Sequence, residues 1–149
     1  MSLNWLSVLS HACSLPCGIV AKAVCLFKSQ IYDSEYYIVR YEELEEFNEY
    51  WVSEYLSKLD YLSERFDCDD FAMLYKALAV MITKKNGFIF VVGKLYGSDG
   101  KFLGYHAWVL VITDRGWYFV EPQTGDIFPA GCKAESHDGF MYEVLWVVC

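Results

Sequence analysis

The hydrophobic pattern of this 149-residue sequence changes at Gly87, and this change limits most narrowly what the chain can fold into. Before Gly87, apolar residues recur at three- and four-residue steps over residues 42–62 and 69–84, which predicts two helices. After Gly87, β-rich runs alternate with turn sequences, which predicts strands. The predicted strands cover residues 88–96, 102–112, 117–121 and 140–148. Helices followed by an antiparallel sheet indicate an α+β domain.

The predicted helix at residues 69–84 is apolar nearly all the way round, so we expect it to be a central buried helix packed on the antiparallel β-sheet. The chain shows no internal repeat and no Pro/Gly/Ser-rich linker. We therefore expect one domain over residues 1–149. Residues 1–62 would form its helical N-terminal part, and residues 63–149 would form the central helix and the sheet.

Composition excludes several classes of protein. With 55% hydrophobic and 18% aromatic residues, the chain has ample material for a core. Its net charge of −8 argues against nucleic acid and anionic membranes as partners. No segment looks long enough to span a bilayer, and no convincing signal peptide is present, so we expect a cytoplasmic protein. The six cysteines include no Cys-x-x-Cys pair, which disfavours zinc, and we expect reduced, mostly buried thiols.

Cys68 lies where a loop meets the predicted buried helix. Free backbone N–H groups and the positive end of the helix dipole favour a thiolate there, which is the reactive form of cysteine. The same N–H groups could stabilise an oxyanion. A buried cysteine that only fills space is the simpler alternative. Cys17 also precedes a helical run and is a second candidate nucleophile, although no further motif surrounds it.

His106 and Glu121 are the candidate partners of Cys68. If the sheet packs against the helix, His106 can reach Cys68 and act as its base. Glu121 ends the neighbouring strand of a predicted hairpin, where its carboxylate could orient the imidazole. Gln123 or Asp126 could take that orienting role instead.

These residues stand in three motifs, Asp67-Cys68-Asp69-Asp70-Phe71-Ala72, His106-Ala107-Trp108-Val109 and a strand ending Glu121-Pro122. The order resembles the transglutaminase-like/papain-like cysteine peptidase superfamily. The first motif is most similar to bacterial transglutaminase-like cysteine proteinases. The resemblance implies a papain/transglutaminase-like core and a cysteine hydrolase, a thiol protease or amidase.

Within that resemblance, a Cys68-His106-Glu121 catalytic triad would act on a peptide or protein substrate through an acyl-enzyme. Gln30 is a candidate oxyanion-hole residue, because papain-like enzymes place a glutamine upstream of the nucleophile. Two other functions remain open: a catalytically silent binding or structural domain of the same fold, and an acyl transferase of the transglutaminase type.

Three carboxylates flank the candidate nucleophile, namely Asp67, Asp69 and Asp70. Nearby negative charge opposes thiolate formation, so a reactive Cys68 needs these groups to point away or to hold a cation. Clustered oxygen ligands suit calcium. The bacterial proteinases that this motif resembles hold calcium beside the nucleophile, which implies a possible Ca²⁺ site here. The chemistry itself requires no cofactor.

Overall fold

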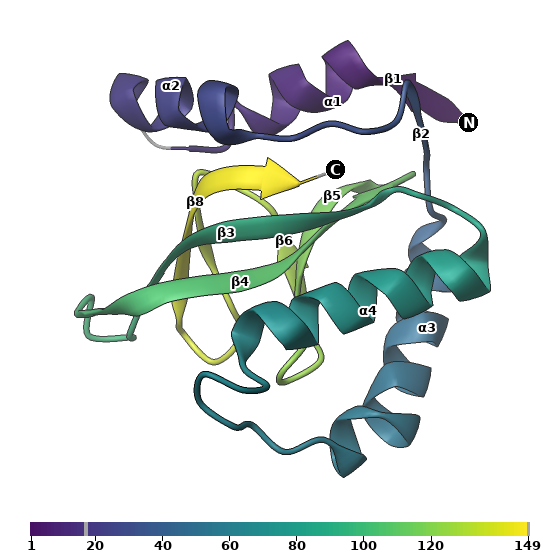
Figure 1. The fold of residues 1–149 in the computed structure, drawn as a ribbon, viewed down its shortest axis with the longest axis vertical. Helices are drawn as coiled ribbons and strands as arrows, with labels where there is room; N and C mark the ends of the chain where they lie inside the picture. Colours follow the sequence, from purple (N-terminus) through teal and green to yellow (C-terminus); the bar gives the residue numbers. More distant parts are fainter. Residues whose placement is uncertain (17, 149) are drawn as a thin grey trace.

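A curved antiparallel sheet forms the centre of the structure, a computed structural model that describes residues 1–16 and 18–148 (Figure 1). Its six strands lie in the order β6-β5-β4-β3-β8-β7, and every neighbouring pair is antiparallel. The strands are β3 (Phe88–Tyr96), β4 (Phe102–Thr113), β5 (Gly116–Glu121), β6 (Asp126–Pro129), β7 (Lys133–Glu135) and β8 (Met141–Val148).

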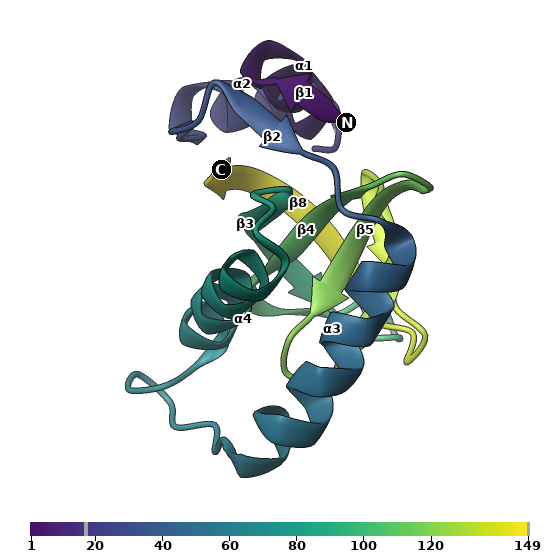
Figure 2. The same ribbon diagram turned by 90° about the vertical axis from the view of Figure 1, so that its right-hand side faces the viewer.

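Helices cover the sheet on two sides (Figures 1 and 2). The first group packs beside β8 and includes a small two-stranded ladder. It consists of β1 (Ser2–Asn4), α1 (Trp5–Ala12), α2 (Ile19–Lys28) and β2 (Glu35–Tyr37). The second group packs on the other face, where α4 lies against β3 and β4. It consists of α3 (Tyr41–Glu54), the short 3₁₀ helix η1 (Leu56–Lys58) and α4 (Cys68–Thr83).

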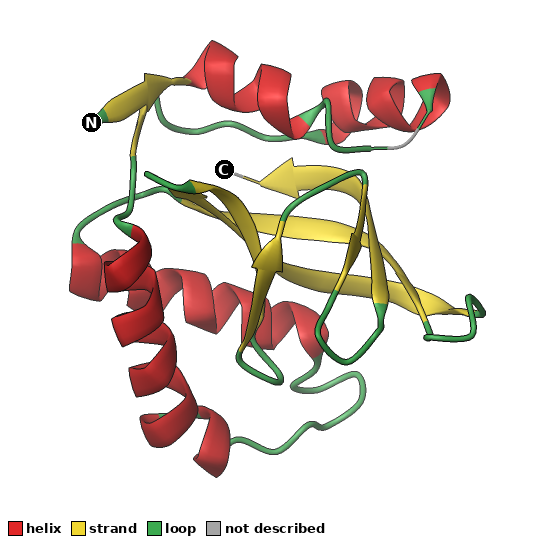
Figure 3. Cartoon of the chain, turned by 180° about the vertical axis from the view of Figure 1, so that it is seen from behind, coloured by secondary structure: helices red, strands yellow, loops and turns green. Residues whose placement is uncertain are grey.

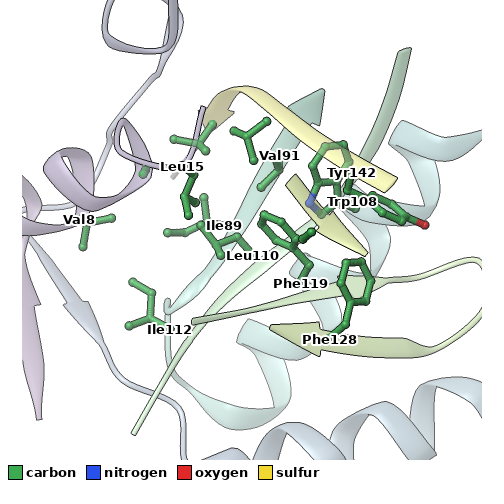
Figure 4. Packing of buried hydrophobic residues seen from close by; sticks show 14 of the residues in the cluster. Val8, Leu15, Ile89, Val91, Trp108, Leu110, Ile112, Phe119, Phe128 and Tyr142 are labelled. Atoms are coloured by element: carbon green, nitrogen blue, oxygen red, sulfur yellow. The ribbon is translucent and has the colours of Figure 1, made fainter. Parts of the chain in front are cut away.

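Strand β4 separates two hydrophobic cores, because successive side chains of a strand point to opposite faces. Trp108 and Leu110 join the core that includes Val8 of α1 (Figure 4). Val109 and Val111 join the core that α3 and α4 cover. Alternate residues of β4 therefore contribute to the two cores.

The sheet curls until its two edge strands approach each other (Figure 3). Asp126 of β6 accepts a hydrogen bond from the backbone N–H of His137, which follows β7. The result is a nearly closed, six-stranded, barrel-like sheet. The prediction of an α+β papain/transglutaminase-like core, a central buried helix packed on an antiparallel β-sheet, is therefore wrong.

The missing pieces in that prediction were the two short edge strands. The sequence at β6 and β7 is interrupted by Pro129 and Gly131, which read as a bend rather than as strands. Pairing with β5 and β8 holds these segments extended all the same. Edge strands of three or four residues carry too little alternation to be recognised, yet they decide whether this sheet closes.

The cysteines differ from the expectation in one respect. Cys132 is disulfide-bonded, so the expectation of reduced thiols is wrong for this residue. Cys25 and Cys68 are free thiols. In the part of the chain that the structure describes, every helix is too short or too polar to cross a membrane.

Candidate functional site

Cys68 is the first residue of α4, and a reciprocal pair of hydrogen bonds fixes where this helix begins. The Asp67 side chain accepts from the backbone N–H of Asp70, and the Asp70 carboxylate accepts from the Asp67 N–H at 3.2 Å. This capping box uses N–H groups that have no partner within the helix. It places the half-buried Cys68 sulfur at the positive end of the helix dipole.

His106 lies on β4 and is buried against Trp108, whose ring stacks on the imidazole at a centroid distance of 6.1 Å. Its Nε2 atom lies 2.5 Å from Oε2 of Glu121. The imidazole also interacts electrostatically with Cys68, which contributes to the rise of the imidazole pKa. The structure thus brings together the three residues that the motifs singled out.

Glu121 is 3% exposed, and its carboxylate is fully engaged. Besides His106, the Tyr142 hydroxyl donates to Oε2 at 3.0 Å, and the Gln123 backbone N–H donates to Oε1 at 3.0 Å. Glu121 and His106 share a face of the sheet and are diagonal neighbours, since the β4–β5 register pairs Val109 with Val120.

Charge and hydrogen bonding decide the protonation of His106. Burial lowers the pKa of this imidazole, but hydrogen bonds and charge interactions with Cys68 and Glu121 outweigh burial and raise the pKa to about 9. The ring is therefore an imidazolium at neutral pH. Burial, together with the Glu121 charge, also raises the pKa of Tyr142, so its hydroxyl remains a proton donor.

The acidic residues around Cys68 separate into two roles. The carboxylates of Asp67 and Asp69 and the sulfur of Cys68 lie within 4.8 Å of one another. A hydrogen bond between the two carboxyl groups lowers the pKa of Asp67 and raises the pKa of Asp69. Asp70 is outside this group, because its carboxylate caps α4.

The alternative residues lie elsewhere or act differently. Gln123 contacts Glu121 through its backbone, and Asp126 pairs with His137. Gln30 bridges to Val148 at the end of β8 and accepts a hydrogen bond from Tyr32, so it has a different set of partners. Cys17 lies outside the described residues.

Sequence reasoning missed Tyr142 as a member of this cluster. Its ring centroid lies 5.9 Å from that of His106, and its hydroxyl holds the Glu121 carboxylate. The only signal was its position in the predicted last strand, where a tyrosine also fits as ordinary core. Only the pairing of β8 with β3 brings it to the site.

Comparisons with known proteins place the chain in a family. Residues 28–127 match the model of the agglutinin C-terminal family. Two solved structures resemble the fold across 99% of this chain: a complex of PSL1a with E64, and the Polyporus squamosus lectin bound to the human-type influenza-binding epitope Neu5Acα2-6Galβ1-4GlcNAc. Identity is 23% and 22%, and the TM-scores are 0.67 and 0.56, respectively.

The chain spans only about half the length of these proteins, 51% of PSL1a and 49% of the lectin. No curated protein matches the chain.

These findings overturn the family expectation drawn from the three motifs. The assignment to transglutaminase-like/papain-like peptidases is wrong, and so is the prediction of an enzyme, a cysteine hydrolase with protease or amidase activity, that followed from it. The motifs occur together here in a different family, whose match extends over residues 28–127. The chain belongs to the agglutinin C-terminal family.

Proposed function

We propose that this chain is a carbohydrate-binding module of an agglutinin. The match of residues 28–127 to the agglutinin C-terminal family carries the proposal. The likeness to the Polyporus squamosus lectin, which was solved with a sialylated trisaccharide, supports it. The expected partner is then a glycan, in place of the peptide or protein substrate that the motifs suggested.

A glycan array with the full chain tests this function. We expect binding to at least one class of glycan, and Neu5Acα2-6Galβ1-4GlcNAc is the first probe because the lectin binds it. Free trisaccharide should compete with the immobilised glycan. A chain that is folded by circular dichroism and binds no glycan on the array would contradict the proposal.

We further propose that Cys68, His106 and Glu121 form a nucleophilic thiol site. The observation that favours it is the position of the His106 imidazole, which interacts electrostatically with Cys68 and lies 2.5 Å from the buried carboxylate of Glu121. A neighbouring imidazolium and the start of a helix both favour the thiolate. In this proposal Cys68 is the nucleophile, His106 holds the proton, and Glu121 orients His106. The expected property is reaction with an electrophile, and no hydrolysis is implied.

Iodoacetamide labelling at pH 7, followed by mass spectrometry, tests the thiol site. Cys68 should react faster than the half-buried Cys13. His106→Asn should slow the labelling of Cys68 at least tenfold, whereas His137→Asn, a matched change of an exposed histidine, should leave the rate unchanged. E64 is a second probe, because PSL1a was solved with it, and Cys68→Ala should abolish its binding. Equal labelling of Cys68 and Cys13 would refute the site.

We also propose that Asp67 and Asp69 hold a calcium ion. Their carboxylates and the Cys68 sulfur lie within 4.8 Å of one another, so a cation bound there would offset the negative charge of both acids. Hard oxygen ligands of this kind suit Ca²⁺. Asp70, the third acid in the original expectation, is not included, because its carboxylate is used at the helix cap.

Calorimetric titration with calcium chloride tests this site. Binding should be present in the wild-type chain and weakened at least tenfold by Asp67→Asn and by Asp69→Asn. Asparagine is chosen at residue 67 because it can still cap the helix. Asp60→Asn, at an exposed position that is not part of the Asp67–Cys68–Asp69 cluster, is the matched control. Absence of calcium binding by the wild-type chain would end the proposal.

A further inference from the structure

We propose that Cys13 and Cys25 are a dithiol site that closes reversibly into a disulfide and so fastens α1 to α2. Cys13 caps the C-terminal end of α1, and Cys25 lies in the second half of α2. Their sulfur atoms are 3.4 Å apart, and the Cys13 thiol donates a hydrogen bond to the Cys25 sulfur. Neither the proposed carbohydrate binding nor the Cys68 site uses this pair.

The two sulfur atoms need only a small movement to bond. Because an S–S bond is about 2.0 Å long, they must approach each other by roughly 1.4 Å. The Cys13 N–H is anchored to the Leu9 carbonyl at 2.8 Å, and the Cys25 carbonyl accepts from the Ser29 N–H at 2.8 Å. The Ser29 hydroxyl lies 3.3 Å from the Cys25 sulfur and accepts from the Val147 N–H of β8. The Cys25 sulfur is thus held in place beside the sheet.

Burial gives the two thiols different roles. Cys13 is half-buried, whereas Cys25 is 0% exposed, so a dissolved disulfide such as oxidised glutathione reaches Cys13 first. The Cys13 thiolate attacks one sulfur of the oxidant, whose S–S bond breaks, and one glutathione thiolate leaves. Cys25 then attacks the Cys13 sulfur of this mixed disulfide, and the second glutathione leaves with the Cys25 proton. Two protein thiols are oxidised, and one glutathione disulfide is reduced to two thiols.

The charge around the pair suits this oxidant. Residues 1–32 contain no Asp or Glu, although the whole chain has a net charge of −8. Lys22 and Lys28 are exposed on α2, three residues before and after Cys25. Their positive charge attracts glutathione, which is an anion at neutral pH. Cys132 is already disulfide-bonded, so oxidation of thiols has a precedent elsewhere in this chain.

The disulfide should stabilise the N-terminal group of helices. Ala12, next to Cys13, packs in the same core as Val147 of β8, so the bond closes a loop between two segments that already pack on the sheet. A disulfide restricts the unfolded chain, and the loop here spans residues 13–25. We expect oxidation to raise the thermal midpoint of the full chain by about 5–10 °C.

Mass spectrometry of the full chain, after exposure to graded mixtures of oxidised and reduced glutathione and an acid quench, tests the proposal. Trypsin cuts after Lys22 and Lys28, so the expected cross-link joins peptide 1–22 to peptide 23–28. Fragmentation spectra then assign the bond to Cys13 or to Cys17. We expect the Cys13–Cys25 bond to form as the share of oxidised glutathione rises and to open again when reduced glutathione is restored.

Three variants separate the steps. Cys25→Ser should stop at the mixed disulfide, so that glutathione on Cys13 accumulates to about ten times the wild-type level. Cys13→Ser should form no cross-link and should leave Cys25 unmodified, because that thiol is buried. Cys68→Ala removes a cysteine from the other cluster and is the matched control, which should keep the cross-link.

Three outcomes would overturn the proposal. They are a wild-type chain that stops at glutathione on Cys13, a bond from Cys13 to a different cysteine, and no modification of either thiol in pure oxidised glutathione. Should Cys25→Ser fail to fold, Cys13→Ser decides, because residue 13 is only half-buried.

Discussion

Three hydrogen bonds converge on the carboxylate of Glu121, from His106, from the Tyr142 hydroxyl and from the Gln123 N–H. These donors come from β4, from β8 and from the segment after β5. One side chain therefore ties together parts of the sheet that are far apart in the sequence. A buried charge with this many partners is stabilised only while all of them are present.

Glu121→Ala should lower the free energy of unfolding by about 3–5 kcal/mol, because it leaves the His106 imidazolium buried without its counter-charge. It also leaves two buried donors without an acceptor. Urea unfolding followed by fluorescence measures the loss. Glu49→Ala, at an exposed position of α3, is the control and should change stability by no more than about 0.5 kcal/mol. A similarly small effect of Glu121→Ala would show that the Glu121 carboxylate does not stabilise the folded chain.

Stability should also depend on the proton at His106. Its pKa is raised from 6.5 to about 9 in the folded chain, so the folded state binds this proton more tightly than the unfolded state. The stabilisation is complete below pH 6.5 and is lost as the pH rises through 9, with a total of about 3 kcal/mol. Urea unfolding at pH 6.5 and 9.5 measures the difference. Titration of the His106 ring near pH 6.5 by nuclear magnetic resonance would contradict this account.

At the scale of elements, β3 approaches its neighbours closely at Gly93. A Cβ atom there would lie 2.2 Å from the carbonyl oxygen of Glu143 and 2.3 Å from the ring of Trp108. The register of β3 with β8 shifts at this point. The approach of two backbones and an indole ring thus depends on the absence of a side chain at this residue.

Gly93→Ala should destabilise the chain by about 3 kcal/mol, since backbone and a buried ring must both move to make room. It should also displace the indole ring of Trp108, which stacks on the His106 imidazole. Thermal unfolding and the fluorescence of Trp108 measure the two effects. Gly131→Ala is the matched control, because a Cβ atom at Gly131 meets nothing within 4 Å. Equal stability of the two variants would disprove the close approach.

Long elements could be predicted from their periodicity, and short ones could not. The alternation in β4 correctly placed Trp108 and Val109 on opposite faces, because twelve residues carry the pattern. The helix predicted for residues 42–62 ends at Glu54. The spacing of apolar residues continues beyond this point, but the chain there forms the 3₁₀ helix η1. The edge strands β6 and β7 were not predicted, and they curl the sheet.

At the scale of the whole molecule, helices α1 and α3, on opposite sides of the sheet, each share a hydrophobic core with it. Val8 and Ala12 of α1 pack in one core, and Trp51 of α3 packs in the other. We propose on this basis that residues 1–149 form one domain, with residues 1–62 unable to unfold separately.

Unfolding should therefore be a single cooperative transition. Circular dichroism in the far ultraviolet, which reports the helices, and tryptophan fluorescence should give the same midpoint in urea. Calorimetry should give equal calorimetric and van't Hoff enthalpies. Two separated transitions, with helix lost before the tryptophan signal changes, would show that the N-terminal helices are an independent unit.

The proximity of Cys68, His106 and Glu121 was easier to predict than the family. Cys68 and His106 stand in short motifs whose placement at a helix start and on a strand follows from local patterns. The choice of Glu121 over Gln123 and Asp126 needed the register of β5 on β4, and Tyr142 needed the partner of β8. Family membership is spread over residues 28–127, so three local motifs could not reveal it.

The division of β4 between two cores has a consequence for how such a sequence diverges. Neighbouring positions such as Trp108 and Val109 touch unrelated sets of side chains. During evolution, the residues of the core that α3 and α4 cover could therefore be replaced while those of the core that includes Trp108 are preserved, or the reverse. Substitutions at alternate positions of β4 should therefore covary with one another and with the core that they face. Substitutions at adjacent positions of β4 should vary independently.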